Sequence, residues 1–390
     1  MNKIYLDHAA TTRLSPQVFE AMEPYFTKFY GNPSSVYTTG QESARAVSDS
    51  REKVAEILGA EEQEIIFTAG GTEANNMAIK GVAFALQDQG KHIITSSIEH
   101  HAVLHACEQL EKVYGFEVTY LEVDKEGFVD PGDLKKAIRD DTILVSIMMA
   151  NNEIGTIEPI KELAELAKDK GVYFHTDAVQ AIGQTKVDVK DLGIDLLSLS
   201  AHKFNGPKGV GALYIRKGTK IIPLLSGGAQ ERQKRAGTEN VAGIVGMAKA
   251  LEIATIELDK NIEYMRNLRD KLINEIESKI EYSILNGPRN ENRLANNVHF
   301  CFRYIEGEAI LLNLDMLGIA ASSGSACTSG SLDPSHVLLA IGHPHEIAHG
   351  SLRLSIGLDT TVEDVEYVSS VLPSIVQKIR DMSPLYVEQK

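Results

Sequence analysis

One lysine stands where an amine could act as a nucleophile. Lys203 lies in SLSAHKFNGPKG (198–209), after an apolar stretch and before a Gly/Pro turn, with Ser200 and His202 beside it. A lysine in a place with little water loses part of its preference for the charged form, so its amine can form a Schiff base. An isolated lysine of this kind is more often a surface residue in a loop. Only the neighbouring segments favour the chemical role.

A carboxylate ends another apolar stretch. Asp177 lies in HTDAVQ (175–180), three residues before Gln180. An aspartate at the end of a strand could pair with the ring nitrogen of pyridoxal phosphate (PLP), which keeps that ring an electron sink. Alternatively Asp177 is a helix N-cap or a buried structural carboxylate, and taken alone the motif favours these structural roles.

A glycine pair precedes a predicted helix in TAGGTEANNMAIKG (68–81). The backbone N–H groups of Gly71 and Thr72, with the Thr72 hydroxyl, would face an anion at the helix N-terminus. The segment fits neither the P-loop pattern nor G-x-G-x-x-G, which disfavours nucleotide binding. It is interpreted as a phosphate cup, with an ordinary strand-to-helix turn as the alternative.

Histidines follow a further predicted strand, in SIEHHAVLHACEQL (97–110). The His100 ring could stack on an aromatic cofactor and move protons. His101 and His105 have the i, i+4 spacing of a zinc pair, but no third ligand is evident in the sequence. We therefore predict no resident metal site.

Composition narrows the class of protein. The chain has 390 residues, and 54 acidic against 39 basic residues give a net charge of −15, which disfavours a broad nucleic-acid surface. Three cysteines predict reduced thiols rather than a disulfide framework.

The N-terminal MNKIYLDHAATTRLSP lacks the apolar run of a signal peptide, and no 18-residue apolar stretch occurs. We expect a cytoplasmic protein with no membrane partner.

Alternating apolar and amphipathic stretches predict an α/β fold that positions these residues. The expected buried strands are 64–70, 91–100, 116–123, 142–153, 172–180, 194–203 and 209–217. Helices are expected at 159–171, 241–278, 306–317 and 362–380, and further strands at NNVHFCF and SLRLSIG. The change of pattern after about residue 241 predicts a large α/β domain over 16–260. Residues 1–15 and 261–390 are expected to form a smaller α+β domain.

Together these segments resemble the cysteine desulfurases of the NifS/IscS type, in the class V group of fold-type I PLP enzymes. The match is collinear over essentially the whole chain, through YLDHAATT (5–12), GNPSS (31–35), GGTEANN, EHHAVL, NNEIGT, HTDAVQ, SAHKFNGPKG, RAGTEN (235–240), ASSGSACTSGSLDPSHVL (321–338) and AHGSLRLSIG (348–357). The RAGTEN and AHGSLRLS segments look closer to NifS than to IscS. The resemblance implies a mainly parallel seven-stranded sheet covered by helices. It also implies a smaller domain that carries a catalytic cysteine loop at about 322–335.

The resemblance implies roles for the matched residues. Lys203 would carry PLP, His100 would stack on its ring, and Asp177 would bind the ring nitrogen. The other cofactor ligands would be Asn152 and Gln180 at the ring hydroxyl, Gly71, Thr72, Ser200 and His202 at the phosphate, and Thr238 from the second subunit of a homodimer. Arg353, together with Asn152, would bind the substrate carboxylate, for which a planar guanidinium is suited.

Cys327 is the predicted catalytic thiol. It lies among small polar residues in SSGSACTSGS, and an exposed thiol on a mobile loop can become a nucleophile, whereas a buried thiol is inert. Cys107 in AVLHACEQL and Cys301 in VHFCF fit a core role better.

The implied reaction converts L-cysteine to L-alanine and leaves the sulfur as a persulfide on Cys327. The persulfide would donate sulfur for iron–sulfur cluster assembly or other sulfur-containing products, with a scaffold protein of the NifU/IscU type as acceptor. Whether Cys327 ligates a cluster transiently through its persulfide is left open. The alternatives are a selenocysteine lyase or an aminotransferase of the same fold, and a non-catalytic assembly partner.

Overall fold

The structure is a computed structural model that describes residues 3–323 and 334–387. Its strands are β1 (Ile4–Tyr5), β2 (Ile65–Thr68), β3 (His92–Ser96), β4 (Glu117–Leu121), β5 (Thr142–Ser146), β6 (Tyr173–Asp177), β7 (Leu196–Ser200), β8 (Gly211–Ile215), β9 (Ser283–Leu285), β10 (Asn297–Phe302), β11 (Ile319–Ala320) and β12 (Ser351–Ser355).

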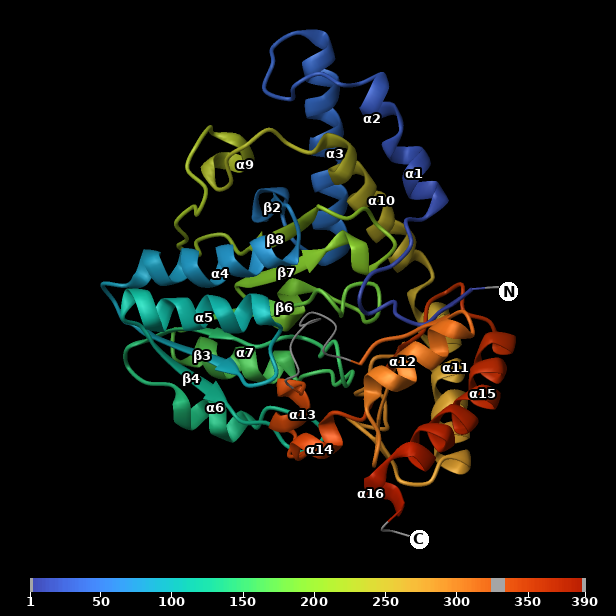
Figure 1. The fold of residues 1–390 in the computed structure, drawn as a ribbon. Helices are drawn as coiled ribbons and strands as arrows, with labels where there is room; N and C mark the ends of the chain where they lie inside the picture. The colour runs from blue at the N-terminus through green and yellow to red at the C-terminus, as the bar shows by residue number, and fades with distance from the viewer. Residues whose placement is uncertain (1–2, 324–333, 388–390) are drawn as a thin grey trace.

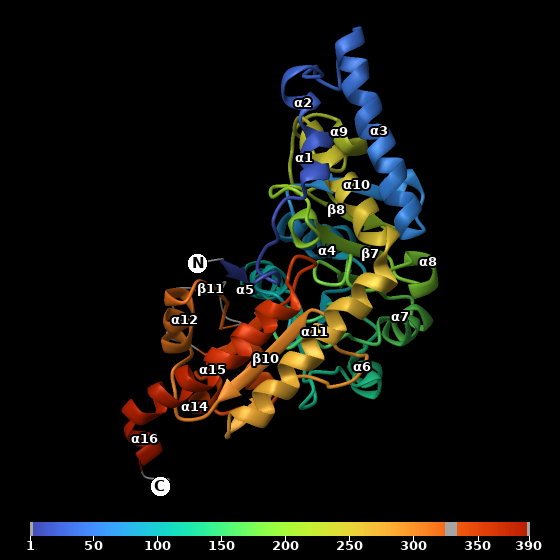
Figure 2. The same cartoon turned by 90° about the vertical axis from the view of Figure 1, so that its right-hand side faces the viewer.

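The helices run around and between these strands (Figures 1 and 2). They are α1 (Pro16–Met22), α2 (Pro24–Thr27), α3 (Thr38–Leu58), α4 (Gly71–Leu86), α5 (His101–Tyr114), α6 (Pro131–Ala137), α7 (Ile160–Asp169), α8 (Val189–Leu192), α9 (Gln230–Gln233), α10 (Val241–Ile256), α11 (Leu258–Lys279), α12 (Gly307–Met316), α13 (His336–Ala340), α14 (His345–Ala348), α15 (Val362–Met382) and α16 (Pro384–Val387), with short 3-10 turns η1 (Glu62–Glu64) and η2 (Ala201–Lys203).

Seven strands form one sheet in the order β2-β8-β7-β6-β5-β3-β4. Only β8 runs against its neighbours, since β2–β8 and β7–β8 are antiparallel and the other pairs are parallel. Strands β2, β3, β5, β6 and β7 therefore all end at the same edge. The predicted seven-stranded, mainly parallel sheet is confirmed. Strands β2, β3, β5, β7 and β8 are buried on both faces, as their apolar runs indicate, whereas the edge strand β4 is partly exposed.

Helices cover both faces of this sheet, and we call the sheet with these helices the large lobe. On one face α4 and α5 pack in a core with β2, β3 and β7. On the other face α3, α7 and α10 pack in a second core with the same sheet. This layering fixes the strand ends, so the residues that follow them are held on a rigid edge.

A three-stranded antiparallel sheet, β12-β10-β9, forms the small lobe together with α11, α12 and α15. The N-terminal β1 pairs with β11, so residues from both ends of the chain share this core. Figure 2 shows α11 and α15 side by side across β10. The predicted domain boundaries at 15 and 260 stay a prediction.

The single long helix predicted over 241–278 is wrong. The chain breaks at Glu257, whose φ of −118° and ψ of 32° are not helical, so α10 and α11 are separate helices. The apolar α10 packs against α3 and α1, whereas the charged α11 packs against α15. The two helices belong to different cores, and the chain changes direction where it passes from one to the other.

No helix in the described ranges has the length and apolar content needed to span a membrane.

Leu163 tests how much the helix layer contributes to stability. Its side chain is fully buried on α7 in the core of the large lobe. Leu163→Ala should lower the free energy of unfolding by about 2–5 kcal/mol, because it removes buried methyl groups and leaves a cavity. The neighbouring exposed Glu165→Ala should change it by less than about 0.5 kcal/mol. Urea unfolding followed by circular dichroism measures both, and equal effects would contradict the described packing.

Candidate active site

The first turn of α4 forms one wall of an open cleft of about 720 Å³. Four of the predicted ligands line it: Gly71, Thr72, Ser200 and His202. Gly70, which precedes the helix, has φ +148°, a conformation that favours glycine. A Cβ at Gly71 would come within 2.7 Å of Val179 Cγ2. The two glycines thus let the helix N-terminus lie close to the residues that follow β6, and N–H groups at a helix N-terminus suit an anion.

His202 is neutral in this cleft. Its Nδ1 lies 3.1 Å from Thr11 Oγ1. Burial, with the neighbouring charges of Lys203 and Lys208, lowers the pKa of His202 to about 4. The positive charge that lines the cleft is therefore that of Lys208, whose Nζ donates to the Thr12 carbonyl at 3.3 Å. A cation beside a helix N-terminus suits a phosphate group.

Lys203 lies in η2, directly after β7, and its amine is held by the N-terminal segment. Its Nζ donates to the Ala9 carbonyl at 2.5 Å and to the Ala10 carbonyl at 2.9 Å. Gln180 Nε2 donates to the same Ala9 carbonyl at 2.9 Å. Lys203 and Gln180, both predicted site residues, thus donate to the same backbone carbonyl near the N-terminus of the chain.

Asp177 ends β6, and its carboxylate is almost fully buried. One oxygen accepts a hydrogen bond from Asn75 Nδ2 at 2.6 Å, and the other accepts from the Val179 backbone N–H at 2.9 Å. Asn75 was not predicted. The feature of the sequence that could have indicated Asn75 is a polar residue on the side of α4 where alanines pack on the sheet.

His100 is the N-cap of α5 and lies near Asp177 and Lys203. Its Nδ1 accepts from the Ala102 backbone N–H at 3.1 Å, so the ring proton of the neutral form is on Nε2. Burial lowers the pKa of His100, and Lys203 lowers it further, against the opposing effect of Asp177. A neutral aromatic ring beside a carboxylate and an amine can stack on a flat cofactor.

Arg353 lies on β12 in the small lobe and is 2% exposed. Its Nη1 donates to the Asn152 carbonyl at 2.9 Å, and its Nη2 pairs with Asp7 Oδ1 at 3.0 Å. The structure brings the predicted substrate-binding residues Arg353 and Asn152 together. The role of Asp7 was not predicted, because contacts made across 346 residues leave no local pattern in the sequence.

Two predicted residues are not brought into this group. Thr238 is exposed between α9 and α10 and does not line the cleft formed by the described residues. Cys327 lies outside the described residues. The other two thiols, Cys107 and Cys301, are buried and unbridged. Burial raises the pKa of both, that of Cys301 to about 12, which makes them poor nucleophiles.

The tandem histidines form a contact of their own. The His101 ring lies 4.9 Å from that of His105 and 4.8 Å from that of His336 in α13. In the described part of the chain, no three His, Cys, Asp or Glu side chains are arranged to hold a metal ion.

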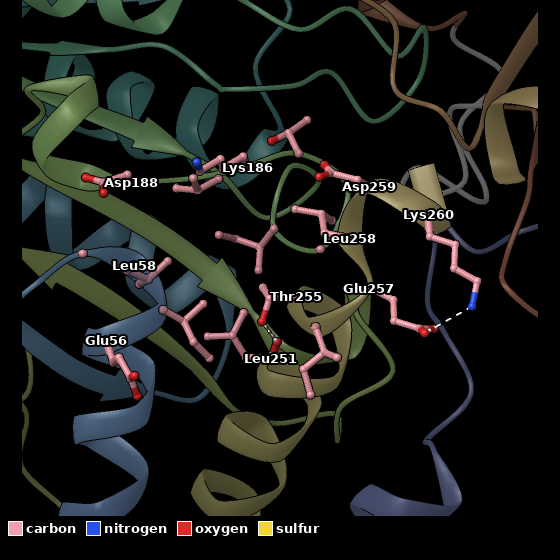
Figure 3. A pocket seen from close by; sticks show the side chains of 17 residues that line it. Glu56, Leu58, Lys186, Asp188, Leu251, Thr255, Glu257, Leu258, Asp259 and Lys260 are labelled. Atoms are coloured by element: carbon pink, nitrogen blue, oxygen red, sulfur yellow. Dashed lines mark hydrogen bonds and ion pairs between the residues drawn. The ribbon is translucent and has the colours of Figure 1, made fainter. Parts of the chain in front are cut away.

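A separate cavity of about 670 Å³ opens where α10 meets α11, between the end of α3 and the loop before α8 (Figure 3). Acidic and basic side chains, among them the Glu257–Lys260 ion pair, surround an apolar floor that includes Leu58 and Leu251. None of the predicted site residues lines it.

The residues at the sheet edge fit PLP. The cleft at α4 has backbone N–H groups of a helix N-terminus and Lys208 on its wall, as a phosphate group requires, and a Cβ at Gly71 would crowd Val179 there. A buried carboxylate, a neutral imidazole and a lysine amine lie beyond it at the same edge. This donor set matches the phosphate, ring nitrogen, ring face and aldehyde of the cofactor.

The model of the aminotransferase class-V family matches residues 4–368. The chain belongs to this family. A cysteine desulfurase IscS of Dictyoglomus turgidum is 62% identical over 388 residues, which are 100% of this chain and 98% of the relative. The IscS of Methanosarcina thermophila is 63% identical over 382 residues, 98% and 94% of the two chains. A solved NifS-like protein has 40% identity and a TM-score of 0.91, with 97% of this chain and 100% of the other covered.

The predicted family, the fold class and the PLP cofactor of the family are confirmed. The relatives place the chain among the cysteine desulfurases of this family. Both the IscS and the NifS names occur among them, so the closer relation to NifS stays a prediction.

A substitution at Asp177 tests whether this carboxylate supports an electron-withdrawing cofactor at the sheet edge. Asp177→Asn should keep the hydrogen bond to Val179 yet slow turnover by about 100-fold or more, since removing one electrostatic stabiliser costs about 10²–10³ in kcat. The PLP absorbance band should persist. The measurement is kcat for alanine formation.

Asp195→Asn is the matched control, because Asp195 is a buried carboxyl at the opposite end of β7. It should lower stability and leave kcat per folded enzyme unchanged. An Asp177→Asn enzyme as fast as this control would make Asp177 a structural residue.

Proposed function

We propose that this chain removes sulfur from L-cysteine at the carboxyl edge of the large sheet, with Lys203 as the central base. The observation that supports the proposal is the convergence of Lys203, Gln180 and Arg353 on the segment Asp7–Ala10, so that the proposed base and the proposed carboxylate-binding arginine contact the same segment. Asp177 and His100 lie at the same edge.

PLP, when bound, supplies an electron sink for the pair of electrons left when a substrate Cα–H bond breaks. Asp177 would bind the ring nitrogen, and the neutral His100 would stack on the ring. Gly71, Thr72, Ser200 and His202 would hold the phosphate, and Asn152 and Gln180 would lie at the ring hydroxyl. Lys203 Nζ takes the Cα proton, while Arg353 fixes the substrate carboxylate so that this proton faces the amine.

Sulfur transfer requires a thiolate, which we assign to Cys327. Its sulfur bonds to the substrate sulfur as the substrate carbon–sulfur bond breaks, and that bonding pair stays with the carbon skeleton. The skeleton takes up one proton at Cβ, regains at Cα the proton that Lys203 had removed, and leaves as L-alanine, so the products are alanine and a persulfide on Cys327. The buried Cys107 and Cys301 are unsuited to this step because burial raises the pKa of each thiol.

We further propose a cytoplasmic homodimer in which Thr238 of each subunit donates to the phosphate in its partner's cleft. Its exposure at the end of a loop is compatible with a role in a second copy. A scaffold protein of the NifU/IscU type would accept the persulfide sulfur. A reducing compartment would keep the Cys327 thiol available for each cycle.

Lys203→Ala tests the base. The variant should fold but lose alanine formation by at least about 100-fold, the lower end of what general acid–base groups contribute. It should also lack the absorbance band that borohydride removes from the parent. Lys168→Ala, on the exposed face of α7, should behave as the parent. Near-normal alanine release by Lys203→Ala would refute the proposal.

Cys327→Ser separates desulfuration from the alternative activities. The variant should bind PLP and cysteine but form almost no sulfide, because a hydroxyl at pH 7 is a far poorer nucleophile than a thiolate. Cys107→Ser and Cys301→Ser should retain activity, with stability losses of about 1–3 kcal/mol from a buried hydroxyl.

Mass spectrometry of the cysteine-treated parent should find one added sulfur on Cys327. Unchanged turnover of Cys327→Ser would favour an aminotransferase, and an adduct on Cys107 or Cys301 instead would refute the assignment of the thiol.

A further inference from the structure

The chain from α9 to the start of α10 (230–241) is held within α9 by a buried ion pair. Glu231 is 5% exposed, and its two carboxylate oxygens each accept from one Arg51 Nη at 2.7 Å. The same carboxylate accepts from the Phe67 backbone N–H at 2.9 Å. Arg51 also donates to the Ile65 carbonyl at 2.7 Å and lies 4.5 Å from the centroid of the Phe67 ring. Strand β2 and helix α3 thus hold Glu231 from two sides.

The backbone at this point is strained. Glu231, Arg232 and Gln233 have φ values of 46°, 55° and 63°, and none of them is glycine. Consecutive non-glycine residues in the left-handed region persist only where their surroundings impose that conformation. The Arg51–Glu231 pair is the buried contact that imposes it here, and it determines the direction in which the following residues leave α9.

Two further contacts hold the same segment at Arg235 and Asn240. Arg235 donates to both carboxylate oxygens of Glu73 at 2.8 and 3.3 Å, and Glu73 lies in the first turn of α4 beside the phosphate cleft. Asn240 then caps α10 by accepting from the Gly243 N–H at 3.1 Å. Thr238 lies between the last two attachments and is exposed. Figure 1 shows α9 above α4 and to the left of α3.

We infer that Arg51 and Glu231 are positioning residues that hold Thr238 in place for the phosphate of a second copy of this chain. The inference rests on the proposed function, in which Thr238 acts across a dimer. A hydroxyl that reaches a phosphate in another subunit binds it more tightly when its segment is rigid, because a mobile segment would lose conformational entropy on binding. Glu231 touches neither cofactor nor substrate and acts through Thr238, so its effect is felt in the partner's cleft.

The first test compares affinity for PLP with stability. Glu231→Gln leaves Arg51 without its charged partner, and Arg51→Lys keeps the charge but loses the two-pronged geometry. Both should raise the dissociation constant for PLP at least tenfold, with kcat at saturating PLP nearly unchanged. Equilibrium dialysis against PLP measures the constant, and thermal unfolding of the apo form measures stability.

Asp195→Asn is again the control, since it disrupts a different ion pair in the same lobe, between the buried Asp195 and the exposed Arg216. It should lower stability without changing the affinity for PLP. Thr238→Ala should weaken PLP binding as much as Glu231→Gln does, and the double variant no more than either. Additive losses, or equal affinity losses in Asp195→Asn, would overturn the inference.

Mixed dimers test whether Glu231 acts across the interface. In the first, one subunit carries Lys203→Ala and the other Glu231→Gln, so the one competent cleft receives Thr238 from a subunit with intact Glu231. In the second, both substitutions lie on one subunit, and the competent cleft of the other receives Thr238 from the altered segment. The PLP concentration for half-maximal alanine formation should be normal in the first dimer and at least tenfold higher in the second.

Equal values in the two dimers, or the reverse order, would overturn the positioning role. Absence of alanine formation in the unaltered dimer would instead refute the proposed function. Normal PLP affinity of Thr238→Ala, in a dimer that does form alanine, would overturn the inference while leaving the desulfurase activity intact.

Discussion

The backbone of the N-terminal segment, residues 6–12, is held from both lobes at once. The large lobe provides Lys203 and Gln180, which both donate to the Ala9 carbonyl. The small lobe provides Ser355, whose backbone N–H donates to the Leu6 carbonyl at 2.7 Å, and Arg353, which pairs with Asp7. The position of the reactive amine is thereby tied to that of the arginine on the other lobe.

The same arrangement limits the number of full charges at the site. His100 and His202 have lowered pKa values because they are buried near Lys203, so both rings are neutral at pH 7. Burial likewise raises the pKa of Glu99, next to His100, well above its ordinary value. The charged groups at the sheet edge are then the Lys203 amine, the Asp177 carboxylate, the Lys208 amine in the cleft and the Arg353–Asp7 ion pair.

The sequence indicates the residues at the sheet edge well, because each follows an apolar strand and parallel strands end together. This pattern locates Asp177, Ser200 and Lys203 at one edge, whereas their roles toward the cofactor come from the family resemblance and stay predictions. Contacts that close the site were not found, since the carbonyls of Ala9 and Ala10 are backbone groups that any residue would provide. The break at Glu257 was missed because neither glycine nor proline stands near it in the sequence. The left-handed turn at Glu231 was missed because it contains no glycine and depends on Arg51, 180 residues away.

Arg353 links substrate binding to the chain that leads toward Cys327. Its side chain faces Asp7 and Asn152, while its backbone pairs with Ser322 through hydrogen bonds of 2.6 and 3.2 Å. Ser351 on the same strand donates to the Ser323 carbonyl at 2.9 Å. The buried strand β12 therefore carries the proposed carboxylate-binding residue and also holds Ser322 and Ser323 by hydrogen bonds. A displacement of the β12 backbone is expected to affect both the proposed recognition of the substrate carboxylate and the start of the segment that leads toward Cys327.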